Sequence, residues 1–132
     1  MKKVILFIFL LLISRSLPAP GFRLIYVARA PLIRSYEPLI RAVVAVESES
    51  GKRIFNKEEN AVGYFQIRPI RVRDYNQRTG SSYKLKEFYN YELSRKVFLY
   101  YAEGKDYEKA AKDWNGSGKK TKVYWKKVKA QL

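Results

Sequence analysis

The chain has no cysteine and no histidine among its 132 residues. The lack of cysteine excludes disulfide bonds, thiol nucleophiles and cysteine-bound zinc or iron–sulfur clusters. The lack of histidine excludes a Ser-His-Asp triad and an imidazole that shuttles protons at neutral pH. Acid–base chemistry near pH 7 would therefore depend on carboxylates, tyrosines or lysines whose pKa values are shifted by their surroundings.

Acidic residues are also scarce. Asp and Glu number 12 against 27 Lys and Arg, which gives a formal net charge of +15. Such a charge favours an anionic partner, which composition alone leaves open as a nucleic acid, an acidic lipid surface or an acidic polymer. The length predicts one domain with a modest core.

The one long hydrophobic run is at the N-terminus, where two lysines precede the apolar residues Val4–Ile13 and small residues follow at Ser14 and Ser16. This pattern is typical of a secretory signal peptide, whereas a membrane-spanning helix needs about 20 apolar residues. We expect residues 1–16 to be a signal cleaved after Ser16, with an uncleaved membrane anchor as the alternative. Processing leaves a charge of +12, so the exported protein is itself basic.

The remaining chain divides into an N-terminal arm, residues 17–31, and one domain, residues 32–132. Strand signals are few, and Ala61–Ile67 is too short to assign by periodicity. Apolar spacing and end signals predict five helices, from Ser35 to Gly51 and over Val72–Gln77, Tyr91–Tyr101, Tyr107–Trp114 and Tyr124–Leu132. Asp106 is the expected N-cap of the fourth helix, and Trp125 and Val128 are expected to face inward on the fifth. The fold class is therefore predicted to be mainly α, a compact helical domain with little or no sheet.

One acidic residue lies on the apolar face of the first predicted helix. Leu39, Val43 and Glu47 are spaced four apart, so Glu47 continues a buried stripe. Burial and the nearby helix C-terminus both disfavour the charged carboxylate and raise its pKa toward the range of a general acid. The plainer interpretation is a solvated or ion-paired glutamate that ends a helix. Glu49, about 200° further around the helix, is expected to be a surface charge.

Three motifs occur in order: Val46-Glu47-Ser48-Glu49-Ser50, Ala61-Val62-Gly63-Tyr64-Phe65-Gln66-Ile67 and Trp114-Asn115-Gly116. Together they resemble the lytic transglycosylase family, which has the goose-type lysozyme fold, and in their compact spacing its small single-domain members. The resemblance covers about residues 38–128. It implies a lysozyme-like fold and an enzyme that cleaves the β-1,4 bond between N-acetylmuramic acid and N-acetylglucosamine in peptidoglycan.

The resemblance also implies roles for individual residues. Glu47 matches the catalytic acid/base, and the residues expected to bind or border the substrate are Ser48, Gly63, Tyr64, Gln66, Trp114 and Asn115. Ser48 would support the glutamate, and Gly63 would allow close backbone approach to the saccharide. Tyr64-Phe65 stands where the family commonly has Leu-Met, and Trp114 where it has Tyr. An indole cannot accept a hydrogen bond as a tyrosine hydroxyl does.

In the family mechanism the glutamate protonates the glycosidic oxygen while the substrate N-acetyl group stabilises the cationic centre. The resulting carboxylate then deprotonates the muramic acid 6-hydroxyl, and a 1,6-anhydro end forms. This route needs no metal or cofactor, and no second carboxylate, which most glycosidases require, is evident in the motifs beyond Asp113. The alternatives are a hydrolytic lysozyme on the same fold and a non-catalytic cationic module that binds cell-wall glycan.

The signal and the resemblance together predict an exported monomer of the periplasm or cell envelope that acts on peptidoglycan strands. The lysines at 119, 120, 122, 126, 127 and 129 form either a solvated helix face or a contact to an anionic wall polymer or membrane surface. A sequence-specific nucleic-acid partner is not expected, because the chain has no recognition motif for one.

Overall fold

The computed structural model describes residues 35–132. The predicted signal peptide and arm, and residues 32–34 of the predicted domain, lie outside the described residues. Of the described residues, 60% are helical and 5% are in strands, which confirms the predicted mainly α class with very little sheet. Within this part of the chain no helix has the length and apolar character needed to cross a membrane.

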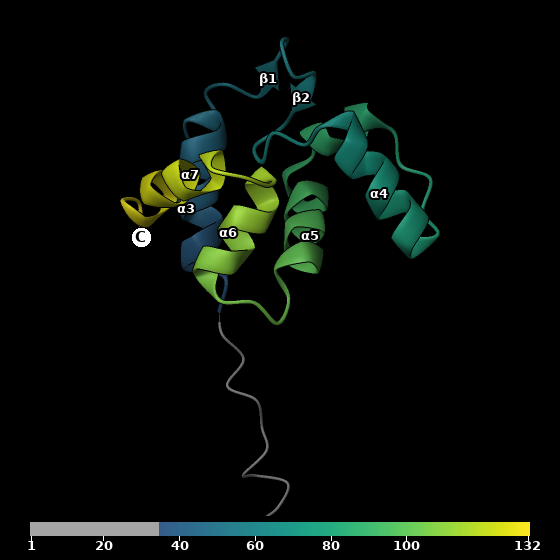
Figure 1. Cartoon of the computed structure of the whole chain (residues 1–132). Helices are drawn as coiled ribbons and strands as arrows, with labels where there is room; N and C mark the ends of the chain where they lie inside the picture. The colour runs from purple at the N-terminus through teal and green to yellow at the C-terminus, as the bar shows by residue number, and fades with distance from the viewer. Residues whose placement is uncertain (1–34) are drawn as a thin grey trace, which may run out of the picture. The chain divides into compact units, whose positions relative to one another are not determined.

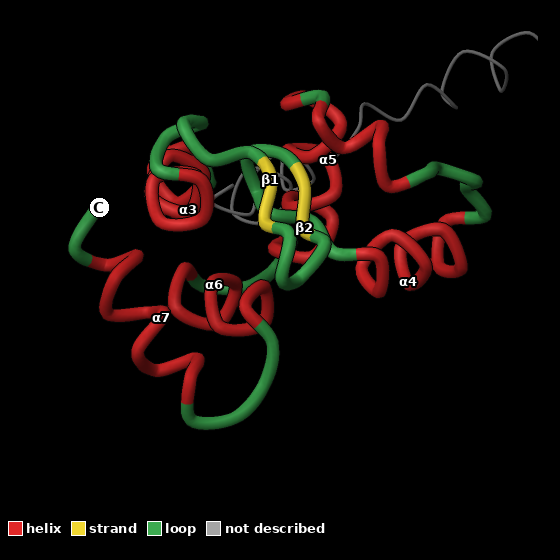
Figure 2. Tube along the Cα trace, turned by 90° about the horizontal axis from the view of Figure 1, so that it is seen from above, coloured by secondary structure: helices red, strands yellow, loops and turns green. Residues whose placement is uncertain are grey.

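A small hairpin separates the first described helix from the others (Figure 1). Seen from two directions, the hairpin lies between α3 and α4 (Figures 1 and 2). The elements are α3 (Glu37–Ser48), β1 (Phe55–Asn56), β2 (Ala61–Val62), α4 (Pro69–Thr79), the 3-10 helix η1 (Leu85–Tyr89), α5 (Tyr91–Ala102), α6 (Tyr107–Asn115) and α7 (Lys120–Lys129).

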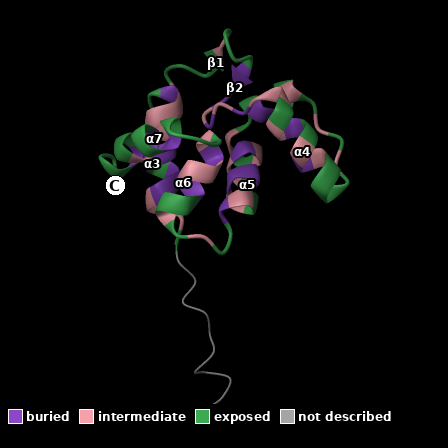
Figure 3. Ribbon diagram, in the orientation of Figure 1, coloured by how far each residue is buried: buried purple, intermediate pink, exposed green. Residues whose placement is uncertain are grey.

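The core is built from one face of each of the five helices and from the segment after β2 (Figure 3). Leu39, Ile40 and Val43 bury the apolar face of α3 against α6 and α7. The ring of Phe98 lies 5.4 Å from that of Phe65 and 5.1 Å from that of Trp114. Each such side chain contributes about 1.5–3 kcal/mol by leaving water, so these contacts fix how the helices pack.

The helices predicted over Tyr91–Tyr101 and Tyr107–Trp114 are confirmed as α5 and α6. The Asp106 side chain accepts a hydrogen bond of 2.8 Å from the backbone N–H of Lys109, which confirms the predicted N-cap. The first predicted helix is confirmed as α3, although its N-cap is Tyr36 rather than Ser35. Pro69 is the first residue of α4. A proline is tolerated there because the first N–H groups of a helix have no partner within the helix.

The predicted boundaries of the last helix are wrong. The helix α7 begins at Lys120, four residues before the predicted start at Tyr124, and ends at Lys129. Thr121, Tyr124 and Val128 form its buried face, whereas Trp125, predicted to face inward, is only partly buried. The lysine-rich start concealed the helix because three of its first four residues are polar, and only Thr121 among them is buried.

The segment Ala61–Ile67, which periodicity left unassigned, forms β2 and a tight turn. The backbone of Val62 pairs with that of Ile67, and the turn between them passes through Gly63 at φ 77° and Gln66 at φ 48°. Both values lie in the left-handed region, where side chains other than glycine are strained. This turn places the second motif beside the end of α3.

Gly63 offers a test of the fold. A Cβ at this position would lie 2.1 Å from the backbone oxygen of Phe88, which also accepts a hydrogen bond of 2.7 Å from Ser94. We expect Gly63→Ala to lower the free energy of unfolding by more than ~3 kcal/mol, because backbone must move. The matched control is Gly80→Ala, at φ 69° with nothing within 4 Å, which should cost only ~1–2 kcal/mol. Urea unfolding of both variants measures the difference, and equal losses would contradict the packing at Gly63.

Candidate active site

Glu47 lies in the last turn of α3, on the face that buries Leu39, Ile40 and Val43. Its carboxylate accepts a hydrogen bond of 2.8 Å at Oε1 from the hydroxyl of Tyr124 on α7. The contact joins residues that are 77 positions apart in the sequence. The predicted stripe along α3 therefore does carry a carboxyl into a partly buried position.

Burial is the main influence on the Glu47 carboxyl, and it raises the pKa of Glu47 from 4.5 to about 7. The hydrogen bond from Tyr124 and the positive charge of Arg68 lower this pKa, whereas the negative charge of Glu59 raises it. Burial and the adjacent Glu47 raise the pKa of the Tyr124 phenol well above 10. The phenol thus keeps its proton, and near neutral pH the carboxyl exists in both protonation states.

A cavity of about 450 Å³ opens beside Glu47. Its lining includes three of the residues that the motifs indicated, namely Gln66, Trp114 and Asn115. A second cavity, of about 180 Å³, lies on the hairpin side and is lined by Arg53, Phe55 and Asn56 among others. Glu47 and Gln66 line both cavities, so the carboxyl lies between two open spaces rather than at the end of one.

Gln66 is held by two hydrogen bonds from its amide nitrogen, of 2.9 Å to the backbone oxygen of Gly63 and 3.2 Å to that of Arg53. Together with its left-handed backbone, these bonds fix the side chain next to Glu47. A strained residue that is held in this way at a cavity is characteristic of functional sites.

Three of the residues expected at the substrate lie outside the three described cavities. The Ser48 hydroxyl donates to the backbone oxygen of Val44 and accepts from the N–H of Gly51, both at 3.0 Å, so it closes the end of α3. Gly63 is buried against η1, and its close backbone approach is to Phe88. The Tyr64 ring meets Tyr91 edge-on at 5.2 Å and covers Gly51. All three residues therefore contribute to the packing around the site rather than to the lining of these cavities.

Trp114 borders the larger cavity but is only 5% exposed. Its indole N–H donates to the backbone oxygen of Phe65 at 3.3 Å, and the guanidinium of Arg71 lies 4.7 Å from its ring centroid. Most of the ring is thus committed to the core, and little of it is open for stacking on a sugar. Asn115, the last residue of α6, is partly buried and lines the same cavity.

Sequence reasoning missed three residues of the site. Tyr124 was predicted only as the first residue of the last helix, and that misplaced boundary concealed its inward position. Its spacing from Thr121 and Val128 was the available signal. Glu59 and Arg68 line the larger cavity, and their nearest side-chain nitrogen and oxygen atoms are 4.0 Å apart. No sequence pattern connects either residue with Glu47.

The other acidic residues near the motifs are surface charges. Asp113 contacts Lys105 at 2.9 Å and Lys109 at 3.2 Å, and Glu49, 57% exposed, contacts Arg53 at 3.0 Å. Residues 35–132 contain no group of three acidic side chains placed to hold a metal ion. No family model, curated protein or solved structure matches the chain.

The contact between Glu47 and Tyr124 can be tested without any substrate. The hydrogen bond from Tyr124 stabilises the carboxylate, so Tyr124→Phe should raise the pKa of Glu47 further, by roughly one pH unit. NMR titration of the Glu47 carboxyl carbon measures both values, with Tyr100→Phe as a control at an exposed tyrosine. A Glu47 that titrates near 4.5 in the wild type, or that does not respond to Tyr124→Phe, would contradict this description.

Proposed function

We propose that the protein is an exported enzyme that cleaves the β-1,4 bond between N-acetylmuramic acid and N-acetylglucosamine in peptidoglycan. One observation carries the proposal: Glu47, with a pKa of about 7, lies between two cavities in contact with a tyrosine hydroxyl. A polymer must be held on both sides of the bond that is cut, and a general acid works best when its pKa is near the operating pH. The three motifs and their resemblance to lytic transglycosylases support the same conclusion.

In the proposed reaction the protonated Glu47 donates its proton to the glycosidic oxygen as the bond breaks. The substrate's N-acetyl group stabilises the positive charge that develops at the anomeric carbon. The Glu47 carboxylate then takes the proton from the 6-hydroxyl, whose oxygen closes onto that carbon and gives a 1,6-anhydro end. Tyr124 is suited to stabilise the carboxylate by its hydrogen bond between the two proton transfers, because its raised pKa keeps the phenol protonated. Gln66 and Asn115, which line the larger cavity beside Glu47, would bind the sugars.

One observation favours a hydrolytic outcome instead. Glu59 lines the same cavity as Glu47, so the site contains the second carboxylate that the motifs lacked. A water molecule activated by Glu59 would attack the anomeric carbon and give a hydrated end, as in a two-carboxylate lysozyme. The ion pair with Arg68, at 4.0 Å, keeps Glu59 near the cavity wall.

The products of digestion test the proposal. Purified peptidoglycan should be cleaved to muropeptides whose anhydro ends are lighter by one water than hydrolysed ends, as mass spectrometry measures directly. Glu47→Gln should lower the rate by at least ~100-fold, because it removes the general acid. Glu49→Gln, at the C-cap of the same helix, should leave the rate unchanged. Hydrated ends alone would leave a lysozyme; binding to the wall with no fragments released would leave a glycan-binding module.

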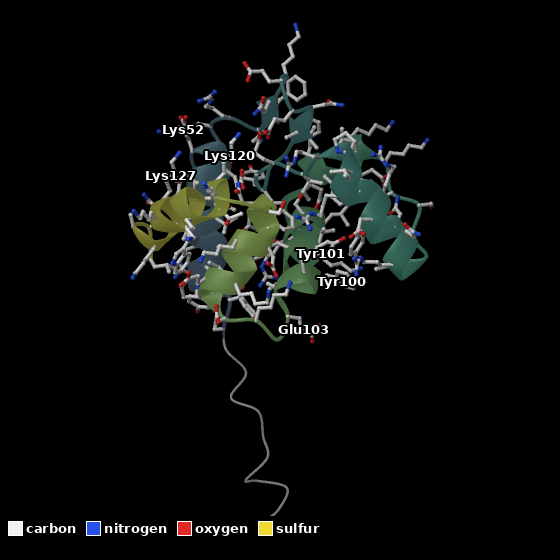
Figure 4. The ribbon with its side chains drawn as sticks, viewed as in Figure 1. Lys52, Tyr100, Tyr101, Glu103, Lys120 and Lys127 are labelled. Carbon is white, nitrogen blue, oxygen red and sulfur yellow. The ribbon has the colours of Figure 1, made fainter. Side chains whose placement is uncertain are left out.

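The exposed lysines of α7 support a second element of the proposal, attachment to an anionic polymer of the cell envelope. No acidic residue follows Asp113, and none of the six lysines takes part in an ion pair recorded for residues 35–132. In the view of Figure 4, the labels of Lys120 and Lys127 on α7 lie on the same side of the picture as that of Lys52, which follows the end of α3. Close spacing of unpaired cations attracts a polyanion and is weakened by salt.

Charge substitution tests this attachment. Lys122, Lys126 and Lys129 are exposed on α7 and lie outside the cavities, so changing all three to Gln should lower retention on purified cell walls several-fold and flatten its salt dependence. Turnover of a short soluble glycan should stay unchanged. The charge-matched control changes Lys57, Lys86 and Lys96, which are exposed on other elements. Equal loss in both variants would indicate net charge alone, and retention by anionic vesicles but not by walls would make lipid the partner.

A further inference from the structure

The larger cavity beside Glu47 contains more positive than negative charge. Its lining includes Arg68, Arg71 and Lys120 against Glu47 and Glu59. A neutral saccharide carries no charge with which these three cations could pair. The excess charge therefore needs an explanation either in the protein or in its ligand.

The protein accounts for Arg71. Its guanidinium donates to the backbone oxygens of Asp113 at 3.3 Å and Trp114 at 2.9 Å, and lies 4.5 Å from the ring centroid of Tyr101. The last carbonyl groups of a helix have no partner within the helix, and Arg71 supplies partners for two of them at the end of α6. Arg71 thus has structural partners in two carbonyl groups and two aromatic rings.

The protein does not fully account for Arg68 and Lys120. Arg68 makes one hydrogen bond, of 3.3 Å to the backbone oxygen of Asn115, and its contact to Glu59 is at 4.0 Å, beyond hydrogen-bond distance. Its guanidinium has five donors, and its side chain is 39% exposed. Lys120 is exposed and takes part in none of the ion pairs recorded for the described residues. These two side chains, from the start of α4 and the start of α7, retain donors that can face a ligand.

The open space continues past Arg68 and away from Glu47. A third cavity, of about 310 Å³, shares Arg68, Ile70, Arg71 and Gly116 with the first. Ile70 is 63% exposed, the most exposed of the large hydrophobic residues in the described part of the chain. A cationic side chain and an exposed aliphatic one therefore lie together at the junction of the two cavities.

We infer that Arg68 and Lys120 form a subsite for a carboxylate on the sugar's side chain, with Ile70 as the contact for the aliphatic part of that side chain. The inference rests on the proposed function and assigns to Arg68, Lys120 and Ile70 a preference for acidic, muramyl-containing strands over neutral chitin-like ones. The carboxylate has two sources, the lactyl group of a sugar without peptide and the peptide attached to that group. Both offer an anion next to methyl groups.

The experiment measures binding separately from cleavage. Full-length Glu47→Gln protein is titrated calorimetrically, at low salt, with three soluble tetrasaccharides: a neutral chitotetraose, a glucosaminyl–muramyl tetrasaccharide without peptide, and the same compound with its peptides. At least one of the acidic compounds should bind about tenfold more tightly than chitotetraose, since a charge-assisted hydrogen bond contributes differences of that size. The acidic compound that binds more tightly identifies the source of the carboxylate.

Variants then assign the effect to the two side chains. Arg68→Gln and Lys120→Gln, each added to Glu47→Gln, should weaken binding of the acidic compound about fivefold to tenfold and leave chitotetraose unchanged, whereas Lys127→Gln on the same helix should change neither. Arg68→Lys, which keeps the charge, should restore part of the loss. Lys120 is exposed, so its variant is expected to fold even if a change at Arg68 loosens the end of α6.

The possible results separate this inference from the proposed function. Equal affinity for neutral and acidic compounds, or equal loss for all three in the variants, would overturn the subsite even if the wild type cleaves peptidoglycan. Selective binding of the acidic compounds that depends on Arg68 and Lys120 would support the subsite even if the wild type released no fragments, in which case the proposed catalysis alone would fail.

Discussion

The hydrogen bond from Tyr124 to Glu47 is the contact on which the rest of the site depends. It holds the last helix of the chain against the end of the first described one, across 77 positions of sequence. A carboxyl that leaves water loses several favourable interactions, and one phenol hydroxyl replaces only part of them. The remaining desolvation cost raises the pKa of Glu47. The same burial that destabilises the charged carboxylate therefore makes this carboxyl suitable as a general acid.

The end of α6 is the second constraint, because α7 can reach Glu47 only if the chain turns sharply after Asn115. Gly116 at φ 135° and Gly118 at φ 84° allow this turn. The carbonyl groups left open at the end of α6 are met by Arg68 and Arg71 from the start of α4. Two arginines that line the larger cavity thus bind the end of α6, and Arg68, which retains free donors, is the one available to a ligand.

Local patterns explain which parts of this arrangement the sequence predicts. The helices α3, α5 and α6 have apolar spacing within their own segments, and α5 and α6 also have side-chain N-caps at Asn90 and Asp106. The position of Glu47 on the stripe of α3 follows from helix geometry alone. The start of α7 could not be found in this way, because its first turn is rich in lysine and is buried only at Thr121. An error of four residues in that boundary was enough to hide Tyr124.

The second motif illustrates another limit of sequence patterns. Its glycine was expected to approach a saccharide, but the nearest atom to a Cβ there belongs to the backbone of Phe88. A motif states that a position must be small or polar, and it does not state which neighbour requires this. Glu59 and Arg68 lie in no motif, and they come to the cavity only because the turn from Gly63 to Gln66 folds the hairpin back toward α3.

A chain without histidine can obtain a group that titrates near neutrality only by perturbing another residue, and Glu47 is that group. Its pKa is higher in the folded state, at about 7, than the 4.5 of an exposed glutamate. Protonation therefore favours folding: the contribution is fully present below about pH 4.5 and is lost as the pH rises through about 7. A shift of this size corresponds to ~3 kcal/mol, a large part of the stability of a domain this small. The aromatic and aliphatic core that packs against α3 must offset that cost at neutral and alkaline pH, because the carboxyl itself borders two cavities and is not part of the core.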